Sequence, residues 1–233
     1  MLPDDCRTLA GSVSIGTSQK TLFLIRHGVA DGTEGRCIGQ TDVPLSAIGR
    51  EQCARLSHTW RPPEQSTIWC SDLTRAHDTA LLLAAHWSLP SHTFRVDALL
   101  RECSFGEWDG RTWDDIQATD QQRLDAWMNE WGTAMPPGGE SLPAFTARVR
   151  VALERVASSE GSHHVIVAHA GVLRAMLCQL TGAPDASAFQ FAMPHAHVSA
   201  VTTSGLSPEG VVQGSLDWLN AFPSPATVTP RIL

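Results

Sequence analysis

Two histidines follow directly after short apolar segments, and they carry the chemistry that this sequence suggests first. Residues 22–25 lead into His27, and residues 165–168 lead into His169. Apolar runs of this length are typical of strands buried on both faces of a parallel sheet. Ligands bind beyond the carboxyl ends of such strands. We therefore expect both imidazoles at one site, where phosphoryl transfer to a ring nitrogen is the chemistry that they favour.

The residues around His27 decide between a structural and a chemical role. A single histidine at a strand end is most often a hydrogen-bonded structural residue, but a core requires neither Arg26 before it nor Gly28 after it. We interpret His27 as a nucleophile whose second ring nitrogen keeps its proton on a carbonyl or carboxylate. His169 would donate hydrogen bonds to the transferring phosphoryl group. Gly28 and Gly171 would allow a sharp turn or a close approach to the ligand.

Arg75 is a candidate phosphate ligand in the first turn of a predicted helix. Ser71 or Asp72 is the expected N-cap of that helix. A helix N-terminus already favours an anion, and a guanidinium there can hold phosphate oxygens. The alternative is an ordinary arginine on a solvated helix surface.

Expulsion of an alkoxide from a phosphate ester requires a proton donor, and three acidic residues are candidates for it. Glu102, Glu107 and Asp109 lie in one glycine-containing loop. Their spacing alone does not choose among them. For Glu107 and Asp109, an acidic loop exposed to solvent is the simpler interpretation.

The composition describes one globular domain. The chain has 233 residues, of which 42% are hydrophobic and 18% charged, and its formal charge is −7. This balance disfavours nucleic-acid binding, and no apolar run is long enough for a membrane span. The six scattered cysteines predict free thiols in a reducing cytoplasm. We expect a flexible extension at 1–20, the domain at 21–220 and a tail at 221–233.

Strands alternate with helices along the chain. Strands are predicted near 21–26, 67–70, 93–98, 165–168, 197–203 and 210–217, and helices near 46–60, 72–87, 113–131, 142–158 and 172–181. Ser46 is the expected cap of the first helix. This order predicts a single-domain α/β fold, a three-layer α/β/α sandwich around a mostly parallel sheet.

We interpret four further histidines and the apolar residues of one predicted helix as structural. We expect His163 and His164 to face solvent, and His195 and His197 to have structural roles. The candidate buried positions of the 113–131 helix are Trp113, Ile116, Leu124, Trp127 and Trp131.

Four motifs in this order resemble those of the histidine phosphatase (phosphoglycerate mutase-like) superfamily. They are residues 26–28, 71–76, 100–110 and 168–174. The resemblance implies a metal-independent phosphomonoesterase without a cofactor, acting on a small-molecule phosphate ester. It selects Glu102 as the acid and implies a phosphohistidine at His27. It assigns phosphate or substrate binding to Arg26, Arg75, His169, Thr33, Gly39 and Ala170.

Residues 35–46 and 136–141 are most similar to the α-ribazole phosphatase branch, whose members act on α-ribazole 5′-phosphate in cobalamin biosynthesis. A cofactor-dependent phosphoglycerate mutase and a broad-specificity sugar-phosphate phosphatase are the enzymatic alternatives. The short segment between Glu102 and Pro136 leaves little chain for the lid that a mutase needs. A phospholigand-binding module without turnover is the non-catalytic alternative. The oligomeric state stays open, a homodimer included.

Overall fold

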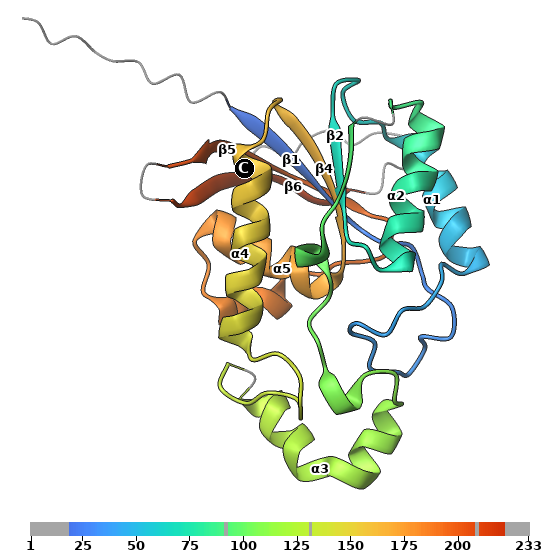
Figure 1. The fold of residues 1–233 in the computed structure, drawn as a ribbon, viewed down its shortest axis with the longest axis vertical. Helices are drawn as coiled ribbons and strands as arrows, with labels where there is room; N and C mark the ends of the chain where they lie inside the picture. The colour runs from blue at the N-terminus through green and yellow to red at the C-terminus, as the bar shows by residue number, and fades with distance from the viewer. Residues whose placement is uncertain (1–18, 91–92, 131, 208–209, 222–233) are drawn as a thin grey trace, which may run out of the picture.

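A six-stranded sheet forms the middle layer of the protein (Figure 1), which is described here from a computed structural model covering residues 19–90, 93–130, 132–207 and 210–221. The strand order is β3-β2-β4-β1-β5-β6. The strands are β1 (Lys20–Arg26), β2 (Thr67–Cys70), β3 (Phe94–Val96), β4 (His163–Ala168), β5 (Val198–Leu206) and β6 (Val212–Ala221).

The sheet is parallel over its first four strands. β2 pairs in parallel with β3 and β4, and β1 pairs in parallel with β4. β5 then runs antiparallel to both β1 and β6. The predicted mostly parallel sheet is therefore confirmed, with an antiparallel pair added at one edge.

Helices cover both faces of this sheet. Leu22 and Leu24 of β1 pack with α4 (Leu142–Ser158) and α5 (Ala170–Thr181). Phe23 and Ile25 point to the opposite face and pack with α1 (Ala47–Thr59) and α2 (Thr74–Trp87). This alternation gives two apolar cores and confirms the three-layer α/β/α sandwich (Figure 1).

Helix α3 (Trp113–Asn129) extends away from the layers, at the bottom of Figure 1. It packs Ile116 and Leu124 against Trp108, as the sequence predicted for both helix residues. Asp120 interrupts the helix with non-helical φ/ψ, and its carboxylate accepts a 2.7 Å hydrogen bond from the indole of Trp108. The kink thus lets α3 fold around that indole. The candidate core residues Trp113 and Trp127 are only partly buried, and Trp131 lies outside the described residues.

The sequence predicted the N-cap of α1 correctly and the N-cap of α2 wrongly. Ser46 caps α1 by accepting the Gly49 N–H at 3.0 Å, as predicted. The predicted cap of α2 is wrong, because neither Ser71 nor Asp72 is its N-cap residue. The Thr74 N–H at that end donates instead to Asp42, 32 residues earlier in the chain.

The prediction of a solvent-facing His164 is also wrong. β4 begins at His163, so His164 lies inside the strand and is 0% exposed. Residues 1–18 and 222–233 contain most of the predicted terminal segments and lie outside the described residues. The five described cysteines are free thiols, as predicted, and Cys6 falls in the undescribed part. None of the described helices has the length and apolar character that crossing a bilayer requires.

Candidate active site

The two histidines that follow apolar strands lie side by side. His27 follows β1 and His169 follows β4, and these strands are neighbours in the sheet. Their ring centroids are 5.0 Å apart. Both side chains are buried, and both line a cleft of about 910 Å³ together with Arg26 and Arg75. The expected meeting of distant segments around one site is present.

The hydrogen bond of His27 determines its tautomer. Its Nδ1 lies 2.7 Å from the carbonyl oxygen of Gly28. Because a carbonyl oxygen only accepts, Nδ1 carries the proton and Nε2 keeps its lone pair. Burial lowers the pKa of His27 well below its usual value, and the charges of Arg75, His195 and Arg26 lower it further. The neutral, nucleophilic form therefore persists into acidic solution.

His169 is buried without a partner for either of its ring nitrogens among the described residues. Burial lowers its pKa most strongly, and His27, Arg75 and Arg26 contribute further. A buried polar atom without a hydrogen bond is costly. A bound anion in the cleft would supply the missing acceptor.

Two of the four arginines that line the cleft, Arg26 and Arg75, bring positive charge close to His27. Arg75 is 1% exposed, and its guanidinium donates to the carbonyl oxygens of Gly39 and Thr41 at 2.6 and 2.9 Å. The alternative of a solvated helix arginine is therefore wrong. Arg26 donates to the Met193 carbonyl at 2.6 Å, and burial lowers its pKa to about 10, so it stays charged at neutral pH.

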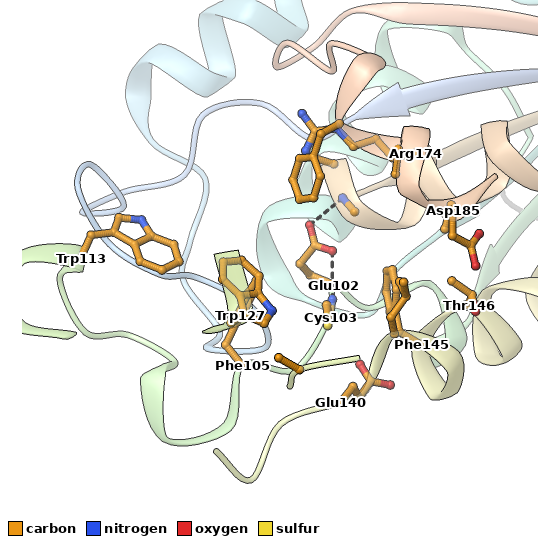
Figure 2. A pocket seen from close by; sticks show the side chains of 17 residues that line it. Glu102, Cys103, Phe105, Trp113, Trp127, Glu140, Phe145, Thr146, Arg174 and Asp185 are labelled. Carbon is orange, nitrogen blue, oxygen red and sulfur yellow. Dashed lines mark hydrogen bonds between the residues drawn. The ribbon is translucent and has the colours of Figure 1, made fainter. Parts of the chain in front are cut away.

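Glu102 also lines this cleft. Its carboxyl group is held by hydrogen bonds from the backbone, which Figure 2 shows as dashed lines. One oxygen accepts the Gly171 N–H at 3.0 Å and the other accepts the Cys103 N–H at 2.9 Å. The other two acidic candidates lie elsewhere. Glu107 is exposed, and Asp109 accepts backbone N–H groups from residues 39–41, so its role is to shape the loop that holds Arg75.

The three remaining predicted substrate residues differ in position. Thr33 lines the cleft, and its hydroxyl donates to the Ala30 carbonyl at 3.1 Å. Gly39 has both backbone groups occupied within the protein, since its N–H donates to Asp109 and its carbonyl accepts from Arg75. Ala170 lines a second cavity beside the cleft.

The sequence analysis gave no site role to several residues that line the cleft, among them His195 and Arg174. The His195 ring lies 5.1 Å from that of His27, and its Nδ1 donates to the His27 carbonyl oxygen at 2.9 Å. His195 precedes β5, and only the antiparallel direction of β5 brings that end to the carboxyl end of β1. Arg174 lies on α5 one helical turn after Gly171, and this spacing could have indicated it. No three potential metal-ligating side chains cluster within the described part of the chain.

Comparison with known proteins identifies the family of this site. A model of the histidine phosphatase superfamily (branch 1) matches residues 22–213. The chain belongs to this superfamily. An adenosylcobalamin/alpha-ribazole phosphatase from Escherichia coli (strain K12) is 33% identical over 184 residues, 77% of this chain and 88% of the relative.

Solved histidine phosphatases have the same fold. The alpha-ribazole phosphatase from Shigella flexneri superimposes with a TM-score of 0.74 at 30% identity, covering 86% of this chain and 96% of its own. A mycobacterial glucosyl-3-phosphoglycerate phosphatase in complex with inorganic phosphate gives 0.72 at 31% identity, over 87% and 97% of the two chains. The predicted enzyme class, a phosphoric monoester hydrolase, is confirmed.

Proposed function

We propose that this histidine phosphatase hydrolyses phosphate monoesters through a phosphohistidine at His27. The observation that carries the proposal is the Nδ1–H bond to the Gly28 carbonyl, which leaves the Nε2 lone pair free for attack. Arg26, Arg75 and His169 line the same cleft and supply positive charge and hydrogen-bond donors for a phosphoryl group.

In the first step Nε2 attacks phosphorus and the ester P–O bond breaks. The electron pair of that bond stays on the alcohol oxygen, which takes a proton from the carboxylic acid of Glu102. The imidazole then carries the phosphoryl group on Nε2 and its proton on Nδ1. The Gly28 carbonyl stabilises the positive charge that develops on the ring.

In the second step water attacks the phosphohistidine. Glu102, now a carboxylate, accepts a proton from that water as the P–N bond breaks and the pair returns to Nε2. Inorganic phosphate leaves, and Glu102 is again a carboxylic acid. Atoms and charge balance over the cycle without any further reactant.

The proposed substrate is α-ribazole 5′-phosphate, supported by the likeness to alpha-ribazole phosphatases. Other relatives at the same similarity are named for glucosyl-3-phosphoglycerate, so a sugar-phosphate phosphatase is the alternative supported by comparison. The free thiols favour a cytoplasmic location. Nothing in the described residues supports a homodimer.

Two other activities differ from this proposal in their products. A phosphoglycerate mutase would convert 3-phosphoglycerate into its isomer, and a phospholigand-binding module would release no phosphate from any ester. Measuring phosphate release and isomer formation from 3-phosphoglycerate, beside phosphate release from α-ribazole 5′-phosphate, therefore distinguishes all three.

The test of the mechanism is a comparison of His27→Ala with His58→Ala, a substitution of an exposed histidine on α1. With 4-nitrophenyl phosphate in EDTA, we expect His27→Ala to lose at least about 10³-fold in kcat. A phosphoenzyme that is sensitive to acid and stable to base should form in the wild type and in His58→Ala, and none should form in His27→Ala. Full turnover by His27→Ala would overturn the proposal.

A further inference from the structure

A second cavity of about 250 Å³ lies beside the catalytic cleft. Figure 2 shows the residues that line this second cavity. Glu102, Phe105, Trp113 and Arg174 line both spaces, so the two are adjacent across a shared wall. The wall of the second cavity is mainly apolar and aromatic. Its apolar lining residues include Trp127, Leu142, Phe145, Ala170, Ala188 and Phe189.

We propose that this cavity receives the leaving alcohol of the substrate and selects esters whose alcohol carries an apolar ring system. The inference rests on the proposed function, in which Glu102 protonates the ester oxygen. The carbon chain of the alcohol must extend from that oxygen, and therefore from Glu102. The second cavity is the apolar space that Glu102 borders in addition to the cleft, and neither His27 nor His169 lines it.

Two carboxylates in the wall of this cavity, those of Glu102 and Glu140, have their hydrogen-bond partners within the protein. The Glu140 carboxylate accepts from Arg148 at 2.7 and 2.8 Å and from the Ser104 N–H at 2.9 Å. Both oxygens of Glu102 accept backbone N–H groups. A ligand here gains little from these two carboxylates by hydrogen bonding, and because the wall is mainly apolar we expect its binding energy to come chiefly from burial of apolar surface.

Size and rigidity favour a planar ligand. A dry cavity of about 150 Å³ holds benzene, so 250 Å³ has room for one or two fused rings. Trp127 stacks on Trp113 at 6.3 Å and meets Phe105 edge-on at 5.6 Å. These contacts hold the Trp127 ring in place in the wall of the cavity. Figure 2 shows Phe145 across the cavity from Trp127, so a ring would enter between two aromatic surfaces.

Phosphate esters of primary alkyl alcohols are suitable test substrates, because these alcohols have similar basicity. Differences in rate between such esters therefore report binding in the subsite and not the quality of the leaving group. We expect kcat/KM to rise at least about tenfold from ethyl phosphate to 2-(1-naphthyl)ethyl phosphate, mainly through KM. Thr146→Phe should fill the cavity from α4 and abolish this gain while ethyl phosphate turnover is unchanged. Thr146→Val and Ala147→Phe, the latter at an exposed neighbouring position, should behave as wild type.

Binding of phosphonates keeps the test independent of catalysis. The wild type should bind 3-(1-naphthyl)propylphosphonate about tenfold tighter than propylphosphonate in calorimetry. Ala134→Phe, on the loop after α3, is a second variant that should fill the cavity if Thr146→Phe does not fold. Equal affinities for the two phosphonates overturn the subsite. If ethyl phosphate is hydrolysed through His27 but the ring brings no gain, the subsite is wrong and the proposed function stands. If the ring raises phosphonate affinity but no phosphohistidine forms, the proposed function is wrong and the subsite stands.

Discussion

The carboxyl group of Glu102 is placed by a residue that has no side chain. A Cβ built on Gly171 would lie 2.3 Å from Oε1 of Glu102. Gly171 has no positive φ, so its backbone does not require glycine, and it lies near the start of α5 where alanine is otherwise favourable. The three nearest heavy atoms that this Cβ would meet all belong to Glu102, so the close approach of that carboxyl group is a reason for glycine here.

Gly171→Ala should therefore displace Glu102 without destabilising the fold. We expect kcat to fall about 10²-fold with little change in KM for a phosphate ester, since an acid shifted by about 1 Å transfers its proton poorly. Gly132→Ala is the matched control, because a Cβ there meets nothing within 4 Å. Equal kcat for Gly171→Ala and wild type would show that Glu102 acts from another position or not at all.

Single residues with chemical roles were predictable where the local sequence carried the signal. An apolar strand followed by histidine indicated both His27 and His169, and the structure puts their rings 5.0 Å apart. The roles of Gly28 and Gly171 were harder to predict from the sequence. A Cβ on Gly28 would lie 2.7 Å from the carbonyl oxygen of Gly49 on α1, so this glycine serves helix packing. The position of His195 in the cleft depends on the direction of β5, and no local sequence pattern indicates that direction.

At the scale of elements, the loop between β1 and α1 and the start of α2 hold each other in place. Asp42 of the loop accepts both the N–H and the hydroxyl of Thr74 at 2.7 Å. In return, Arg75 of α2 donates to two loop carbonyls. The predicted limits of α4, near 142–158, match the structure, in which the adjacent Ser141 caps the helix by accepting the Ala144 N–H. The sequence did not predict the cap of α2, because that cap comes from a different element.

Asp42→Ala should weaken both stability and phosphate binding. Loss of the cap is expected to cost about 1 kcal/mol in the free energy of unfolding. The loosened loop should also raise the inhibition constant of inorganic phosphate severalfold, because Arg75 loses its fixed geometry. Asp42→Asn keeps a capping acceptor and should restore most of both quantities. Urea denaturation and phosphate inhibition measure the two effects, and a lower stability with unchanged inhibition would separate the cap from the site.

At the scale of the whole molecule, the ends of the parallel strands β1 and β4 position the histidines of the proposed phosphate site. The segment around α3 contributes residues to the cavities beside them. Fold class and layer order followed from the alternation of strands and helices, since each buried strand needs helices on both faces. The position of α3 did not follow, because its packing rests on Trp108 and the side-chain bond to Asp120. The second cavity lies in that part of the molecule.

The folded protein also holds several histidines neutral, and this makes its stability depend on pH. Burial lowers the pKa of His164 and of His195 to about 4, with Lys20 and Arg26 respectively adding to the shift. In the unfolded chain these groups take up protons near pH 6.5. The unfolded state therefore binds more protons below that pH, and stability falls as the pH drops from about 6.5 towards 4.

His164→Gln isolates one of these groups outside the cleft. Between pH 7 and pH 5 the wild type should lose several kcal/mol in the free energy of unfolding, and His164→Gln should lose about 2 kcal/mol less. Urea denaturation at both pH values measures the difference. The buffers must contain no phosphate, since an anion bound in the cleft stabilises the folded state and hides the effect. Identical losses in the two proteins would mean that His164 is protonated in the fold at pH 5, against the burial beside Lys20.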